Sequence, residues 1–174
     1  MRNFLLLSIV LSIVLSSVLA ACGGGPNHWK DQPTESVSAT FKGHAYTVDL
    51  PKGMKKGTST YDDDYQYHQD KGGEDYVFAP SVSVSWNDKK GTLEDELKSE
   101  KDPMVHKEST ADGWIATYEN GSKGKGDDFV IHAERFVGDG AFRCNARVYT
   151  MKRGEDVKEL IPLVEKMCVS IKAK

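Results

Sequence analysis

Residues 129–149 read FVIHAERFVGDGAFRCNARVY, and this stretch decides the fold. Two runs in which apolar and polar residues alternate, 129–137 and 141–150, lie on either side of Gly138-Asp139-Gly140. Such alternation predicts two β-strands that each bury one face, and the glycine-rich segment predicts the tight turn that joins them. The sequence therefore predicts a long β-hairpin at the centre of an antiparallel sheet.

The register of this hairpin determines what each face carries, because a shift by one residue moves every side chain to the opposite face. A three-residue turn would mix apolar and charged side chains on both faces. A two-residue turn at Asp139-Gly140, which pairs Gly138 with Ala141, separates them. We predict this register and an apolar face made of Phe129, Ile131, Ala133, Val137, Phe142, Cys144, Ala146 and Val148.

The opposite face of the hairpin is polar, and the same register places His132 across from Arg147. Its candidate binding residues are His132, Glu134, Arg143, Arg147 and Tyr149. One interpretation is a patch that binds an anionic or peptide ligand, since arginine and tyrosine often dominate interfaces. The other is a half-solvated sheet face with weak ion pairs, each contributing under about 1 kcal/mol. The sequence leaves both interpretations open.

The rest of the chain predicts further strands and two helices. Alternating residues predict a hairpin over 36–51, a strand over 82–86 and a meander from Met104 onward. A short helix is expected after Gly91-Thr92, where Thr92 and Asp95 resemble a capping box. A second helix is expected over 155–168, with Pro162 limiting its first turns. The order of elements predicts an α+β domain in which helices flank an antiparallel sheet and the C-terminal helix packs on it.

Residues 62–75 form the most polar run, with Asp62-Asp63-Asp64, His68 and three further acidic residues. Clustered carboxylates suit calcium, but the spacing does not fit an EF-hand loop. We therefore expect a solvated loop here, with an ion site as the alternative.

The N-terminus has the layout of an export signal. Arg2 precedes an uncharged apolar run that ends in Leu19-Ala20-Ala21-Cys22, followed by three glycines. This ending resembles the lipobox of bacterial lipoproteins, in which a diacylglycerol is attached to the cysteine and cleavage occurs just before it. An uncleaved membrane-spanning helix is the alternative, but such a helix gains nothing from the cysteine or from the three glycines. We expect a signal peptide at 1–21, a flexible tether at 22–35 with Trp29 exposed, and one domain at 36–174.

The lipobox also predicts where the protein is located and how its other cysteines behave. The resemblance implies a lipid-anchored protein of the cell envelope, and by lipoprotein sorting Gly23 favours the outer membrane. Outside the cytoplasm two remaining cysteines tend to pair. Cys144 lies on the apolar face of the hairpin and Cys168 on the apolar side of the last helix, so we predict a disulfide between them.

The sequence lacks the catalytic motifs that we looked for, among them a nucleophile elbow, a zinc-protease motif, a P-loop and a Cys-x-x-Cys pair. The formal net charge of −3 argues against nucleic-acid binding. We expect no enzyme, cofactor or metal ligands, and two function classes remain. The first is an envelope lipoprotein that binds a protein partner or supports an envelope complex, and the second is a small-ligand or metal-ion binder.

Several segments together resemble the PsbP-like superfamily. They are residues 48–53 (VDLPKG), 91–97 (GTLEDEL), 112–114 (DGW) and 168–172 (CVSIK). The resemblance spans most of residues 36–172 and implies an α/β/α sandwich with a role in binding or assembly. It carries over no functional residue, because its motifs mark the fold.

The lipobox gives the first testable prediction. Mass spectrometry of the mature protein should find an acylated N-terminal Cys22, with residues 1–21 removed. Replacing Cys22 with serine should abolish the lipid and release the protein from the membrane fraction. A mature chain that keeps Arg2 would contradict the assignment.

Overall fold

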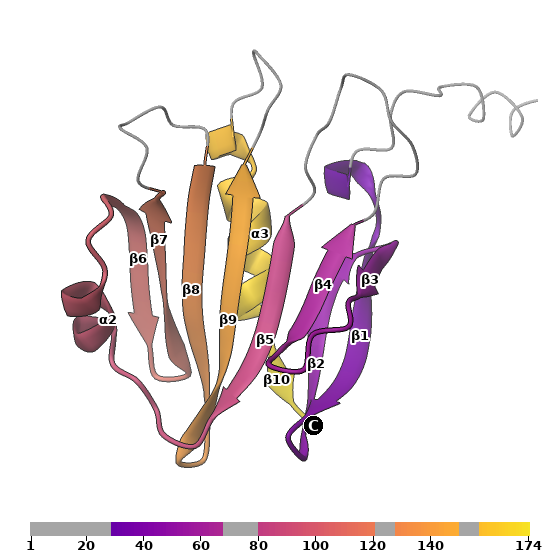
Figure 1. Ribbon diagram of the computed structural model, residues 1–174, viewed down its shortest axis with the longest axis horizontal. Helices are drawn as coiled ribbons and strands as arrows, with labels where there is room; N and C mark the ends of the chain where they lie inside the picture. Colours follow the sequence, from indigo (N-terminus) through magenta and orange to yellow (C-terminus); the bar gives the residue numbers. More distant parts are fainter. Residues whose placement is uncertain (1–28, 68–79, 121–127, 150–156) are drawn as a thin grey trace, which may run out of the picture.

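The computed structural model describes residues 29–67, 80–120, 128–149 and 157–174. Several predicted features lie outside these ranges. They are the signal peptide, Cys22, the first part of the tether, residues 68–75 of the acidic run and residues 155–156 of the last predicted helix. The described chain forms two antiparallel sheets and two α-helices, which confirms the α+β prediction (Figure 1).

The larger sheet has seven strands in the order β3-β4-β5-β9-β8-β7-β6. Its strands are β3 (Met54–Lys56), β4 (Asp63–Tyr67), β5 (Ser81–Asn87), β6 (Met104–Thr110), β7 (Gly113–Glu119), β8 (Asp128–Val137) and β9 (Gly140–Tyr149). The predicted meander is thus present as β6 to β9. Strand β9 then pairs with β5, so the central hairpin joins the two halves of the sheet.

The predicted faces of the β8–β9 hairpin are confirmed, but the predicted pairing is off by two residues. Val137 pairs with Gly140 across a two-residue Gly138-Asp139 turn, and His132 pairs with Asn145, not with Arg147. Gly138 has a φ of 56°, a conformation that favours glycine, which places the turn there. A shift by two residues leaves every side chain on its predicted face.

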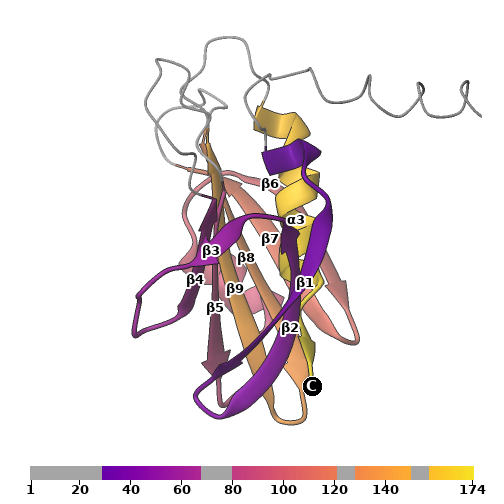
Figure 2. The same ribbon diagram turned by 90° about the vertical axis from the view of Figure 1, so that its right-hand side faces the viewer.

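The second sheet has three strands in the order β1-β2-β10, with β1 at Thr34–Phe41, β2 at His44–Pro51 and β10 at Lys172–Ala173. The hairpin expected over 36–51 is therefore confirmed. The two-residue strand β10 near the C-terminus pairs antiparallel with β2. The figures show this sheet beside the last helix on one face of the larger sheet (Figure 2).

The last helix, α3 (Ile161–Val169), packs on the apolar face of β8 and β9. It is shorter than predicted because Pro162 sits in its first turn, and a separate 3-10 turn, η3 (Val157–Glu159), precedes it. A disulfide joins Cys144 of β9 to Cys168 of α3, as predicted. Closing a loop with a sequence separation of 24 residues stabilises the fold by about 3 kcal/mol in the chain-entropy model.

A buried polar cluster links the two sheets. The hydroxyl of Tyr46 on β2 donates to Asp63 Oδ2 at 2.8 Å and lies 2.8 Å from the hydroxyl of Tyr65. Lys56 pairs with the other oxygen of Asp63 at 2.5 Å. The solvated loop expected over 62–75 is therefore wrong for Asp63 and Tyr65, which are buried in β4. Alternation of Asp63, Tyr65 and Tyr67 is a strand pattern that the acidic composition obscured.

The folded domain begins before residue 36. A 3-10 turn, η2 (Trp29–Asp31), precedes β1, and Trp29 is only 2% exposed. The expectation of an exposed Trp29 in a tether is therefore wrong: the indole packs with the main core, which provides the apolar contacts that a large aromatic ring favours.

Candidate functional site

The helix α2 (Leu93–Ser99) lies over part of the polar face of the sheet. Its start is as predicted: the side chain of Thr92 accepts a hydrogen bond from the backbone N–H of Asp95. Leu93 and Leu97 pack on an apolar patch of β7 that includes Trp114 and Tyr118. This packing turns Glu96 toward the sheet, where only 8% of the residue is exposed.

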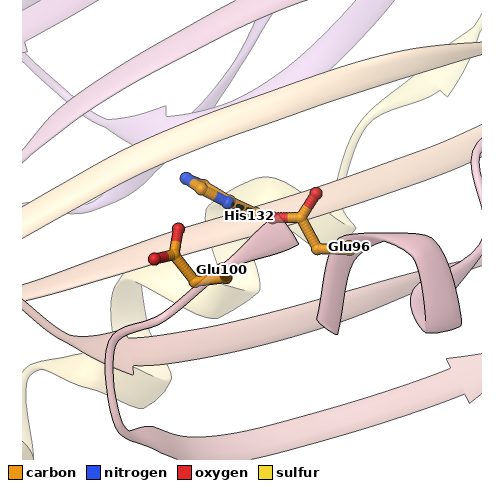
Figure 3. Close-up of side chains that lie close together, drawn as sticks. All are labelled: Glu96, Glu100 and His132. Atoms are coloured by element: carbon orange, nitrogen blue, oxygen red, sulfur yellow. Dashed lines mark hydrogen bonds and ion pairs between the residues drawn. The ribbon is translucent and has the colours of Figure 1, made fainter. Parts of the chain in front are cut away.

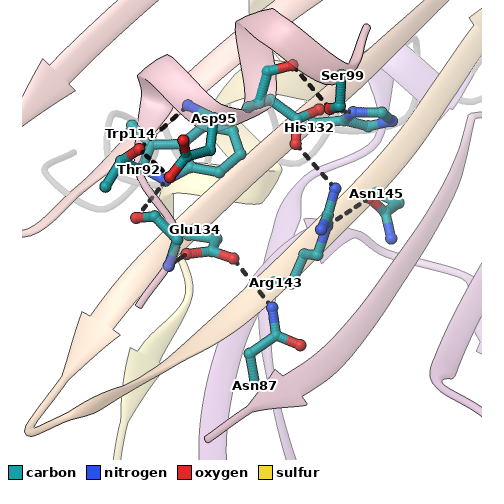
Figure 4. Close-up of polar contacts among 11 residues, drawn as sticks. Asn87, Thr92, Asp95, Ser99, Trp114, His132, Glu134, Arg143 and Asn145 are labelled. Carbon is teal, nitrogen blue, oxygen red and sulfur yellow. Dashed lines mark hydrogen bonds and ion pairs between the residues drawn. The ribbon is translucent and has the colours of Figure 1, made fainter. Parts of the chain in front are cut away.

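Glu96 connects two of the predicted face residues. Its Oε1 is hydrogen-bonded to Nδ1 of His132, and its Oε2 accepts from Nη2 of Arg143 at 3.1 Å (Figure 4). A buried carboxylate is costly unless it is paired and hydrogen-bonded, and here both oxygens are engaged. Glu96 therefore fastens α2 to β8 and β9 at one point.

Glu134 pairs with Arg143 in the register, but its carboxylate is bonded to other partners. It accepts from the backbone N–H of Gly91 at 2.7 Å and from Nδ2 of Asn87 at 3.0 Å (Figure 4). A Cβ at position 91 would lie 3.0 Å from both carboxylate oxygens, so glycine permits this close approach. Glu134 is 2% exposed and holds the segment that leads into α2.

Arg147 and Tyr149 lie beyond the reach of α2. Arg147 binds Asp128 through two hydrogen bonds, 2.9 Å from Nε and 2.6 Å from Nη2, and its guanidinium lies 5.0 Å from the ring centre of Tyr149. The hydrogen bonds to Asp128 raise the pKa of Arg147, so its charge is retained at any physiological pH. About half of the Arg147 side chain stays exposed.

The five predicted residues therefore separate into three groups. His132 and Arg143 meet at Glu96, Glu134 binds the loop before α2, and Arg147 and Tyr149 remain together near the outer surface. In the part of the chain that the structure describes, no ion pair joins Glu134 to either arginine.

Sequence reasoning missed two acidic residues of this region, Glu96 and Glu100. Each offers one ligand atom that lies within 4.8 Å of a ligand atom of the other and of His132 (Figure 3). The available signal was their i, i+4 spacing, which places both on one side of a helix. Their partner His132 is distant in sequence, so no local motif pointed to it.

Two pKa values near this cluster are shifted. Two backbone N–H groups, of Lys101 and Asp102, donate to Glu100 and lower its pKa, with a smaller contribution from His132. Burial raises the pKa of Tyr118 to about 12, with help from the charges of Glu96 and Glu100. At neutral pH the cluster thus combines an ionised Glu100 with a neutral phenol.

A separate cavity of about 200 Å³ lies where η2 and the β1–β2 hairpin meet α3. Trp29, Thr34, Asp49, Leu163 and Lys166 are among its lining residues. Glu96, Glu100 and His132 do not line this cavity, and neither do the other predicted face residues.

No protein-family model matches the chain, and no curated protein resembles it significantly. Within the described residues, no helix has the length and apolar character needed to cross a membrane.

The contacts of Glu134 give a second prediction. Replacing Glu134 with alanine should lower the free energy of unfolding by about 1–3 kcal/mol, because it leaves the Gly91 N–H and the Asn87 amide, both partly buried, without their acceptor. Urea denaturation followed by circular dichroism measures this change. The matched control is Glu108→Ala, since Glu108 is exposed on β6 and should shift stability by under about 0.5 kcal/mol. Equal effects of the two substitutions would contradict the assigned role.

Proposed function

We propose that this protein is a non-catalytic lipoprotein of a bacterial cell envelope, tethered through Cys22, whose domain captures a protein partner. The lipobox-like ending at Cys22 supports the tether, and the α+β fold with helices on its sheet supports the relation to the PsbP-like superfamily. The short distance in sequence between Cys22 and Trp29 would keep the domain close to the bilayer. We infer an outer-membrane location from Gly23.

The proposed contact surface is the outer patch, which we define as Gln66, Ser81, Arg147 and Tyr149. Gln66 pairs with Ser81 in the register, and Ser81 pairs with Arg147, so these three form a row across β4, β5 and β9. Their neighbours Tyr65, Val82 and Ala146 are buried, which places the row on the side of the sheet away from the core.

One observation carries the proposal: Arg147 is held rigidly while half of it stays exposed. Two hydrogen bonds to Asp128 and the contact with the Tyr149 ring restrict the guanidinium, so binding a partner costs little side-chain entropy. Arginine and tyrosine are the residue types that most often dominate protein interfaces. A lipid tether would raise the local concentration of the domain near other envelope components, so a small patch suffices.

Site-specific photocrosslinking in the native host tests this proposal. A photoreactive amino acid at Ser81 should give an adduct of discrete mass, and Arg147→Ser should lower its yield at least about fivefold. The surface ion pair contributes under about 1 kcal/mol, so the variant should still fold. Lys98→Ser on α2 is the control, because Lys98 is exposed and lies outside the patch.

The tether and the patch can be tested separately. Cys22→Ser should reduce the adduct by lowering the effective concentration, while leaving the folded domain intact. An adduct whose yield is unchanged in Arg147→Ser, or equally reduced in Lys98→Ser, would exclude the outer patch as the contact surface.

A further inference from the structure

Three side chains between α2 and β8 form a cluster with the composition of a metal site. Glu96, Glu100 and His132 each offer one ligand atom, and these atoms all lie within 4.8 Å of one another. Figure 3 shows Glu96 on α2, Glu100 directly after the helix, and the imidazole of His132 on β8 beside them. A neutral imidazole and two carboxylates form a mixed nitrogen and oxygen set that suits Zn²⁺.

Each of the three groups has a lone pair that an ion could use. One oxygen of Glu100, Oε1, accepts from the N–H groups of Lys101 and Asp102 at 2.8 and 3.2 Å. These bonds fix the carboxylate, and among the described residues its second oxygen has no hydrogen-bond partner. His132 and Glu96 share a proton between Nδ1 and Oε1, and loss of that proton leaves a lone pair on each of these two atoms for an ion. Arg143 engages Glu96 through Oε2, which orients the carboxylate as outer partners of metal ligands do.

A separate observation at the same place indicates a missing partner. Tyr118 on β7 is 2% exposed, and its hydroxyl has no hydrogen-bond partner within the described structure. Its ring centre lies 5.8 Å from that of His132, and the charges of Glu96 and Glu100 both act on its phenol. Buried hydroxyls normally find a partner, so an unpaired one beside three convergent ligands needs an explanation.

We propose that Glu96, Glu100 and His132 bind one Zn²⁺ ion, and that the Tyr118 hydroxyl donates a hydrogen bond to the group in the fourth coordination position. The ion takes the place of the proton shared by His132 and Glu96, and this proton is released to solvent. Tetrahedral zinc with bonds of 2.0–2.2 Å separates its ligand atoms by roughly 3.4 Å. The present spacing therefore needs only small side-chain movements.

Zinc affinity of the full chain, purified free of metal, tests the site. Titration with ZnCl₂ against a chromophoric chelator should find one ion per chain that depends on the cluster. Glu100→Gln should weaken binding about 10-fold to 100-fold. Its amide oxygen can still accept from Lys101 and Asp102, so the fold is retained. His132→Gln should weaken binding at least as much, and Tyr118→Phe should do so severalfold.

Glu94→Gln is the matched control, because Glu94 lies on the same helix but is exposed. X-ray absorption at the zinc edge should show one imidazole with oxygen ligands. The proposal is wrong if the wild-type chain binds no zinc at micromolar concentration. It is also wrong if Glu100→Gln and Glu94→Gln bind equally, which would indicate that other histidines, such as His44 or His106, hold the ion. Neither outcome bears on partner capture by the outer patch.

Discussion

The separation of apolar and polar side chains on the two faces of the β8–β9 hairpin is the constraint on which the rest of the structure depends. The apolar face is completed by α3, by the Cys144–Cys168 disulfide and by the smaller sheet, and together they form the main core. The polar face carries His132, Glu134 and Arg143, and burying such groups is costly unless each finds a partner. Glu96 and the N–H of Gly91 supply those partners, so the position of α2 follows from the charges beneath it.

Much of this arrangement follows from local sequence. Period-2 alternation identified the hairpin and its faces, and Thr92 with Asp95 identified the start of α2. The disulfide followed because both cysteines lie on apolar faces that must meet. The pairing register was less determined, since turns at Gly138-Asp139 and Asp139-Gly140 differ by two residues and preserve the same faces.

The contacts that were missed join residues far apart in the sequence. Tyr46 reaches Asp63 and Tyr65 in the other sheet, which no pattern within β4 indicates. In the same way, Glu96 looked like one of several acidic residues in the first turn of a short helix, where acidic side chains are favoured by the helix dipole. Its role depends on which sheet face α2 covers, and contacts between residues distant in the sequence decide that.

This division of the polar face has a consequence for function. The part beneath α2 is closed to a large partner, whereas its converging ligands suit a small ion. The part over β4, β5 and β9 keeps an exposed, rigidly held arginine that suits a macromolecular partner. We therefore propose two separate binding surfaces on one face of the sheet, an ion site beneath α2 and a protein contact at the outer patch.

Amide hydrogen exchange by NMR in the Glu96→Ala variant tests most directly the claim that Glu96 fastens α2 to the polar face. A helix of seven residues is not stable alone, so its protection must come from contacts with the sheet. In the wild-type chain the amides of Glu96 and Glu100, bonded to the carbonyls of Thr92 and Glu96, should be protected. In the variant, exchange at the Glu100 amide should accelerate at least about tenfold, with β8 unchanged. Undiminished protection of α2 would contradict the account.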